Sequence, residues 1–129
     1  MGIVSGLLLG GAAIFGLHAI ISGVKEDKKR RETPCHFNDG ISEEQFQNAV
    51  AESTVHIKRL KSFYVEYTIV HGTAVSQSGL SEWSFTIDFN DYGHITGRYW
   101  IRSENSDSTL PKVLAERIKE RITSLSNQQ

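Results

Sequence analysis

Charged and aromatic side chains alternate with apolar ones in the second half of the chain. Alternation with a period of two is typical of strands covered on one face, so we expect these side chains together on the uncovered face of a sheet. Trp and Arg are enriched among the residues that dominate protein–protein binding. The alternative is ordinary cross-strand pairing, of Arg98 and Arg102 with Glu66 and Asp88. The predicted binding residues are Tyr64, Glu66, Asp88, Arg98, Trp100 and Arg102.

Another group of polar residues gives little support for catalysis. His94 follows Asp88 and Asp91 in the sequence, and a His beside a carboxylate is able to act as a general base. No nucleophile elbow, phosphate-binding loop or H-E-x-x-H motif accompanies it. We therefore interpret His94 as a turn residue and predict no catalytic residue. A membrane-tethered enzyme that acts on a small substrate near this part of the chain is the alternative hypothesis.

Cys35 and His36 are adjacent, which raises the question of a metal or of an activated thiolate. A structural metal site needs about four ligands at suitable spacings, whereas this chain has a single Cys and scattered His residues. The sequence therefore predicts no metal and no cofactor. A single Cys also forms no disulfide within the chain, which agrees with a reducing compartment.

The elements that must position the binding residues begin with a helix at Ser42. Ser42 and Gln45 form a capping box, and apolar residues at helical spacing continue to Leu60. A second helix is predicted from Leu110 to Leu125, because apolar residues again recur at helical spacing and Pro111 suits a first turn. Both helices have one apolar face, which is typical of helices laid on a sheet.

Three stretches between these helices show strand periodicity, at residues 63–70, 83–89 and 95–102. Residues 90–93 predict a tight turn between the last two strands, whereas residues 72–79 either extend the flanking strands or form a mobile loop. The sequence therefore predicts an α+β fold: a two-layer α-β-β-β-α domain with a three-stranded antiparallel meander and two helices on one face.

The N-terminal stretch from Ile3 to Val24 has no formal charge. As a helix it would be about 33 Å long, enough to cross a hydrocarbon core of about 30 Å. A signal peptide is disfavoured because no basic residue precedes the stretch and no small-residue cleavage site follows it. We predict four parts: a transmembrane helix (1–24), a basic juxtamembrane segment and polar linker (25–40), an α+β domain (41–126) and a disordered tail (127–129).

Basic residues follow the predicted span immediately, and none precedes it. The positive-inside rule therefore places the C-terminal domain in the cytoplasm. The same residues are able to bind anionic lipid headgroups, although a role as a topology signal alone would account for them. The predicted headgroup residues are Lys25, Lys28, Lys29, Arg30 and Arg31.

Gly2, Gly6 and Gly10 recur every four residues at the start of the predicted span. Small residues at this spacing allow two membrane helices to approach closely. The spacing favours self-association or docking on another membrane helix, while the general abundance of Gly in membrane helices is the competing explanation.

Charge disfavours nucleic acid as a partner. From His36 onward the chain has nine basic and twelve acidic residues, whereas binding to nucleic acid depends on neutralising phosphates. The sequence therefore predicts a single-pass membrane protein whose cytoplasmic α+β domain takes part in protein–protein interaction or self-assembly. An exported domain held outside the membrane is a further alternative.

Overall fold

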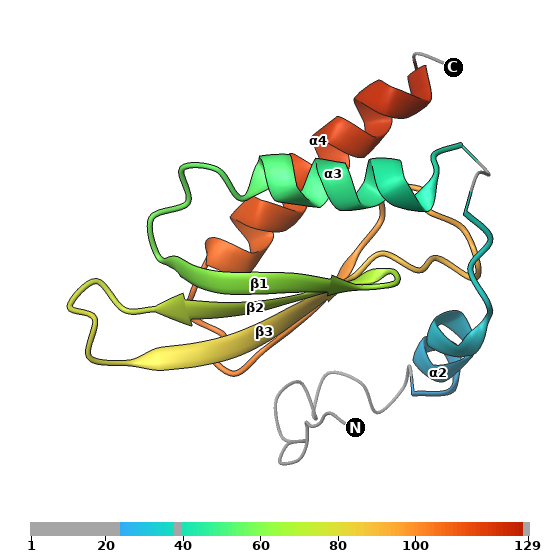
Figure 1. Ribbon diagram of the computed structural model, residues 1–129. Helices are drawn as coiled ribbons and strands as arrows, with labels where there is room; N and C mark the ends of the chain where they lie inside the picture. Colours follow the sequence, from blue (N-terminus) through green and yellow to red (C-terminus); the bar gives the residue numbers. More distant parts are fainter. Residues whose placement is uncertain (1–23, 38–39, 128–129) are drawn as a thin grey trace.

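The computed structural model describes residues 24–37 and 40–127 of the 129-residue chain. The elements, in chain order, are α2 (Val24–Glu32), α3 (Glu43–Ser53), β1 (Leu60–Glu66), β2 (Ile69–Val75), β3 (Glu82–Asp88), β4 (Trp100–Ser103) and α4 (Leu110–Asn127) (Figure 1). In this described part of the chain, no helix has the length and apolar character that crossing a membrane requires. The predicted span and Gly2, Gly6 and Gly10 fall outside the described residues.

The predicted α+β class is confirmed, but the sheet has four antiparallel strands in the order β1-β2-β3-β4, and the prediction of three was wrong. The stretch 63–70 is not one strand, because the chain reverses between Glu66 and Ile69, which pair with each other. Tyr67 begins this turn with a φ of 56°, a conformation that usually falls to Gly or Asn. A reversal at Tyr67 therefore carries no compositional signal.

The tight turn predicted at residues 90–93 is present, with Asp91 and His94 paired through their backbones, but it does not join the two strands directly. β3 ends at Asp88 and β4 begins only at Trp100, so the connection occupies residues 89–99. Within it, Asp91 and His94 form an isolated bridge, and Gly93 and Gly97 have positive φ. The predicted third strand is consequently shortened to four residues.

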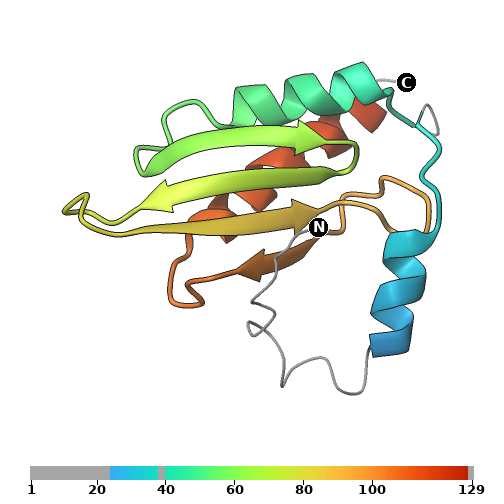
Figure 2. The same ribbon diagram turned by 60° about the horizontal axis from the view of Figure 1, so that its bottom comes forward.

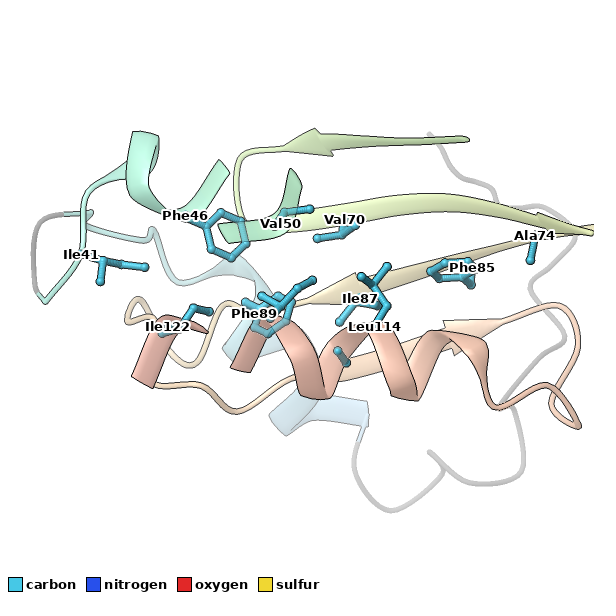
Figure 3. Close-up of a cluster of buried hydrophobic side chains, with 12 residues drawn as sticks. Ile41, Phe46, Val50, Val70, Ala74, Phe85, Ile87, Phe89, Leu114 and Ile122 are labelled. Carbon is cyan, nitrogen blue, oxygen red and sulfur yellow. The ribbon is translucent and has the colours of Figure 1, made fainter. Parts of the chain in front are cut away.

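Helices α3 and α4 cover one face of the sheet, as predicted (Figure 1). The capping box of α3 is present, since the Ser42 hydroxyl accepts a hydrogen bond from the Gln45 backbone and Gln45 Oε1 accepts one from the Ser42 backbone. α3 ends at Ser53, earlier than predicted, and Leu60 opens β1 instead. Figure 3 shows side chains from the helices and strands meeting between the two layers. The buried core consists of Ile41, Phe46, Val50, Val70, Ala74, Phe85, Ile87, Phe89, Leu114, Ala115, Ile118 and Ile122.

The segment predicted as a basic linker is not separate from this domain. Its first part forms α2, which lies beside one end of the sheet on the side away from α3 and α4 (Figure 2). The contacts that hold it there involve the predicted binding residues.

Gly72 leaves room for the ring of its cross-strand partner Phe85. A Cβ atom at Gly72 would lie 2.3 Å from Phe85 Cζ, and the ring is fixed in the core. We expect Gly72→Ala to lower the free energy of unfolding by about 1–3 kcal/mol through overpacking, as measured by urea denaturation. Adding Phe85→Leu should recover part of this loss. Unchanged stability of Gly72→Ala would contradict the close packing of the ring on this glycine.

Candidate functional site

A buried arginine joins α2 to the uncovered face of the sheet. Arg30 is only 2% exposed, and its Nη1 lies 3.3 Å from Oδ2 of Asp88 on β3. Its Nη2 lies 3.1 Å from Oδ1 of Asp27, one turn earlier in α2. The guanidinium also covers Trp100 of β4, with Cζ 3.9 Å from the ring centroid. Arg30 therefore connects one helix with two strands.

Asp27 extends this network to β4 and back to α2. Its Oδ2 lies 2.6 Å from Nη2 of Arg102 and 2.9 Å from Nε of Arg31. Positive and negative groups thus alternate from Arg31 through Asp27 and Arg30 to Asp88. We call Asp27, Arg30, Asp88, Trp100 and Arg102 the Arg30 network.

Asn90 fixes the chain that leaves α2. Its Nδ2 donates hydrogen bonds to the backbone oxygens of Thr33, at 2.9 Å, and Arg31, at 3.2 Å. Its Oδ1 accepts one from the Gly93 backbone, and the Gly93 oxygen accepts one from His36 N. The backbones are so close that a Cβ atom at Gly93 would lie 2.7 Å from the Pro34 oxygen. Residues 33–36 therefore pack on the loop after β3.

Five of the six predicted binding residues are divided between two places. Asp88, Trp100 and Arg102 belong to the Arg30 network, where α2 of the same chain contacts them. Tyr64 and Glu66 lie on β1 and contact His71 of β2: the Tyr64 and His71 rings stack with centroids 4.4 Å apart, and Glu66 Oε1 lies 2.9 Å from His71 Nε2.

Arg98 and Arg102 pair with carboxylates other than Glu66 and Asp88. Arg98 lies 3.7 Å from Asp91, and Arg102 pairs with Asp27. Arg98 Cζ also lies 5.2 Å from the Trp100 ring centroid, so the guanidinium groups of Arg30 and Arg98 both lie near this ring. Among the predicted headgroup residues, Arg30 is buried within the protein, whereas Lys28, Lys29 and Arg31 are exposed.

The sequence reasoning missed Asp27 and Asn90 and assigned Arg30 to the membrane surface. Asp27 and Arg30 at positions i and i+3 of a charged helix were a usable signal for a local ion pair. Nothing local indicates that Arg30 reaches Asp88, because α3 and three strands of the sheet begin between these two residues in the sequence.

The remaining candidates for chemistry are held in structural positions. Cys35 is buried, and its backbone oxygen accepts a hydrogen bond from the Tyr67 hydroxyl. His94 bridges Asp91 through the backbone. Within residues 24–37 and 40–127 no three His, Cys, Asp or Glu side chains converge to hold a metal ion.

Burial and pairing shift the two carboxyl groups of the network in opposite directions. Burial raises the pKa of Asp88, against the opposing effects of the hydrogen bond from the Asn90 backbone and of Arg30. Burial also tends to raise the pKa of Asp27, but the hydrogen bond from Arg30 and the charges of Arg102 and Arg31 outweigh it, so this pKa is lowered. Asp88 is thus occupied by partners and poorly placed to act as a base.

We expect the stabilisation from Asp27 to be lost in acid. A carboxyl whose pKa is lowered by folding stabilises the protein above its ordinary pKa, 3.8 here, and ceases to do so as the pH falls through the lower folded value. Urea denaturation should therefore show a difference in stability between wild type and Asp27→Asn that is largest near neutral pH and shrinks below about pH 4. A difference that is independent of pH would show that Asp27 acts through its shape alone.

Comparisons with known protein families, curated proteins and solved structures give no match to this chain. Function is consequently inferred from the residues themselves. What the described residues show is a charged network that couples a basic helix to a sheet, with the carboxylates of Asp27 and Asp88 paired to arginines.

Proposed function

We propose that this protein is a single-pass membrane protein whose α+β domain binds a protein partner from a fixed position beside the bilayer. The partner that we test first is another copy of the chain. The observation that carries the proposal is the buried Arg30, which attaches the helix after the apolar N-terminal stretch to Asp88 and Trp100 of the sheet.

The sequence supports the membrane part of the proposal. Uncharged residues 3–24 are long enough to span a bilayer, and the basic residues of α2 follow at once. Along a helix, Arg30 lies about 9 Å beyond Val24. A domain held at Arg30 would therefore keep both a short distance from the membrane and a defined orientation, whereas a flexible linker would allow neither.

The surface offered to a partner is the exposed edge of the sheet at β1, which has a neighbour on one side only. Backbone groups on such an edge are available for pairing with a strand of another chain. Tyr64 on this strand is 61% exposed, and Phe63 and Tyr67 are exposed beside it. Aromatic residues of this kind are enriched in protein interfaces. Lys61, also on β1, pairs with Glu82 and leaves the aromatic end of the strand uncovered.

Extraction with alkaline carbonate tests the membrane part. The full-length chain should stay with the membrane pellet, and a variant that lacks residues 3–24 should be released. For orientation, Leu80→Cys in a Cys35→Ser background gives a labelling site on an exposed loop. A membrane-impermeant maleimide should label it only after the cells are opened. Release of the full-length chain by carbonate, or labelling in intact cells, would refute the corresponding part.

A photo-crosslinking residue at Tyr64 tests the binding surface. We expect a crosslinked species that is absent when the same residue replaces Val113, an exposed position on α4. Mass spectrometry of the product then shows whether the partner is a second copy or another protein. Equal crosslinking from both positions, or none from Tyr64, would contradict a binding role for the β1 edge.

A further inference from the structure

A cavity of about 700 Å³ lies at the end of the domain opposite the Arg30 network. Three parts of the chain form it: the loop from α3 to β1, the turn between β2 and β3 with the start of β3, and the loop after β4 with the start of α4. Trp83 in its lining and Asp88 in the network are five residues apart on β3, or about 17 Å. The volume is in the range of about 300–1,000 Å³ that is common for small-molecule sites.

The lining combines an apolar part with a basic one. Ile57, Trp83 and Leu110 contribute apolar surface and are themselves partly buried against the core. Basic side chains come from Lys58, Arg59 and Arg117, and Asp107 is the one acidic residue among the lining residues. Because the sequence from His36 onward has more acidic than basic residues, this concentration of positive charge runs against the overall balance.

Two of the basic side chains are not used by the fold. Neither Lys58 nor Arg59 takes part in an ion pair with another described residue. Their loop is nevertheless held in place, since the Arg59 oxygen accepts a hydrogen bond from Val75 N and Arg117 donates one to the Val55 oxygen. The charges are therefore presented at the cavity on a fixed backbone.

Trp83 contributes an indole ring to the apolar part of the lining. Its Nε1 is buried and has no hydrogen-bond partner among the described residues. The indole is in any case a reporter for binding, since Trp100, the other tryptophan of the chain, lies in the Arg30 network at the far end of the sheet.

We propose that this cavity binds a small organic anion in which a carboxylate or phosphate group is joined to an apolar body. The acid group pairs with Lys58 and Arg59, and the apolar body lies on Ile57, Trp83 and Leu110. Charge complementarity and the apolar lining both follow from this one kind of ligand. The cavity lies away from the β1 aromatic residues, so this site and the proposed protein-binding edge are independent.

The test is an NMR titration of the full-length ¹⁵N-labelled protein, which follows its two indole N–H signals. The probes are 4-phenylbutyrate, phenyl phosphate and the neutral 4-phenylbutanamide. We expect at least one anion at millimolar concentration to shift the Trp83 signal and leave that of Trp100 in place, and the amide to have little effect. The more effective anion identifies the preferred acid group.

Matched variants connect the binding to the basic side chains. Lys58→Gln with Arg59→Gln should weaken the effective anion by about tenfold or more. Lys28→Gln with Lys29→Gln removes the same charge from exposed positions of α2 and should leave the affinity unchanged. Circular dichroism checks that both variants are folded. Absence of a Trp83 shift with either anion, an equal shift with the amide, or equal affinity of both double variants would overturn the proposal.

Discussion

Replacing Arg30 with alanine is expected to lower the free energy of unfolding by about 3–5 kcal/mol, because the change leaves the Asp88 carboxylate buried without its charged partner. Asp88 is 7% exposed, and burial already raises its pKa. Since small domains have a total stability of about 5–15 kcal/mol, a loss of this size would be severe. Urea denaturation followed by circular dichroism measures it without relying on Trp100, whose surroundings change.

Two further variants separate the ion pair from the general effect of altering α2. Lys29→Ala changes the adjacent, exposed residue and should stay within about 0.5 kcal/mol of wild type. Arg30→Met combined with Asp88→Asn removes both charges while keeping an acceptor for the Asn90 backbone, and it should be more stable than Arg30→Ala. If Arg30→Ala unfolds at the same urea concentration as Lys29→Ala, α2 is not fixed to the sheet by this residue.

The parts of the fold that were predictable from sequence are those specified by neighbouring residues. Ser42 and Gln45 satisfy each other's backbone within one helical turn, so the start of α3 was correct. The apolar faces of both helices were also correct, apart from Val113 on α4, because helical periodicity determines which side is buried. The end of α3 was wrong, since His56, with a φ of 68°, turns the chain without Gly or Pro.

The sheet shows why the remainder was not predictable. The reversal at Tyr67 interrupts neither the apolar pattern nor the composition, so a hairpin resembles one long strand. Asp88, Trp100 and Arg102 do come together, but the element that contacts them is α2 of the same chain. Arg30 of α2 donates a hydrogen bond to the backbone oxygen of Asn90, 60 residues later in the sequence. Sequence patterns do not reveal a contact over such a distance. The basic residues after the apolar stretch look equivalent in the sequence. In the structure, Arg30 is buried, whereas Lys28 and Lys29 are exposed.

Replacing Phe46 with alanine is the second change from which we expect a large effect, again about 3–5 kcal/mol. Phe46 is fully buried, and its ring lies 5.5 Å from that of Phe89 and 6.0 Å from that of Phe37, measured between centroids. The variant would leave a cavity between α3 and the sheet that close-packed neighbours fill only in part. Val113→Ala, at a 44% exposed position on α4, should stay within about 0.5 kcal/mol of wild type when measured in the same way.

Phe37→Ala extends the test to the chain between α2 and α3. Phe37 contacts Phe46, and its ring also lies edge-on to Tyr67 with centroids 5.1 Å apart. If residues 33–37 belong to the folded domain, this change should cost about 1–3 kcal/mol, less than Phe46→Ala because Phe37 is only partly buried. Loss of stability in Phe46→Ala with none in Phe37→Ala would mean that the segment is a tether, and a fixed position of the domain would then depend on Arg30 alone.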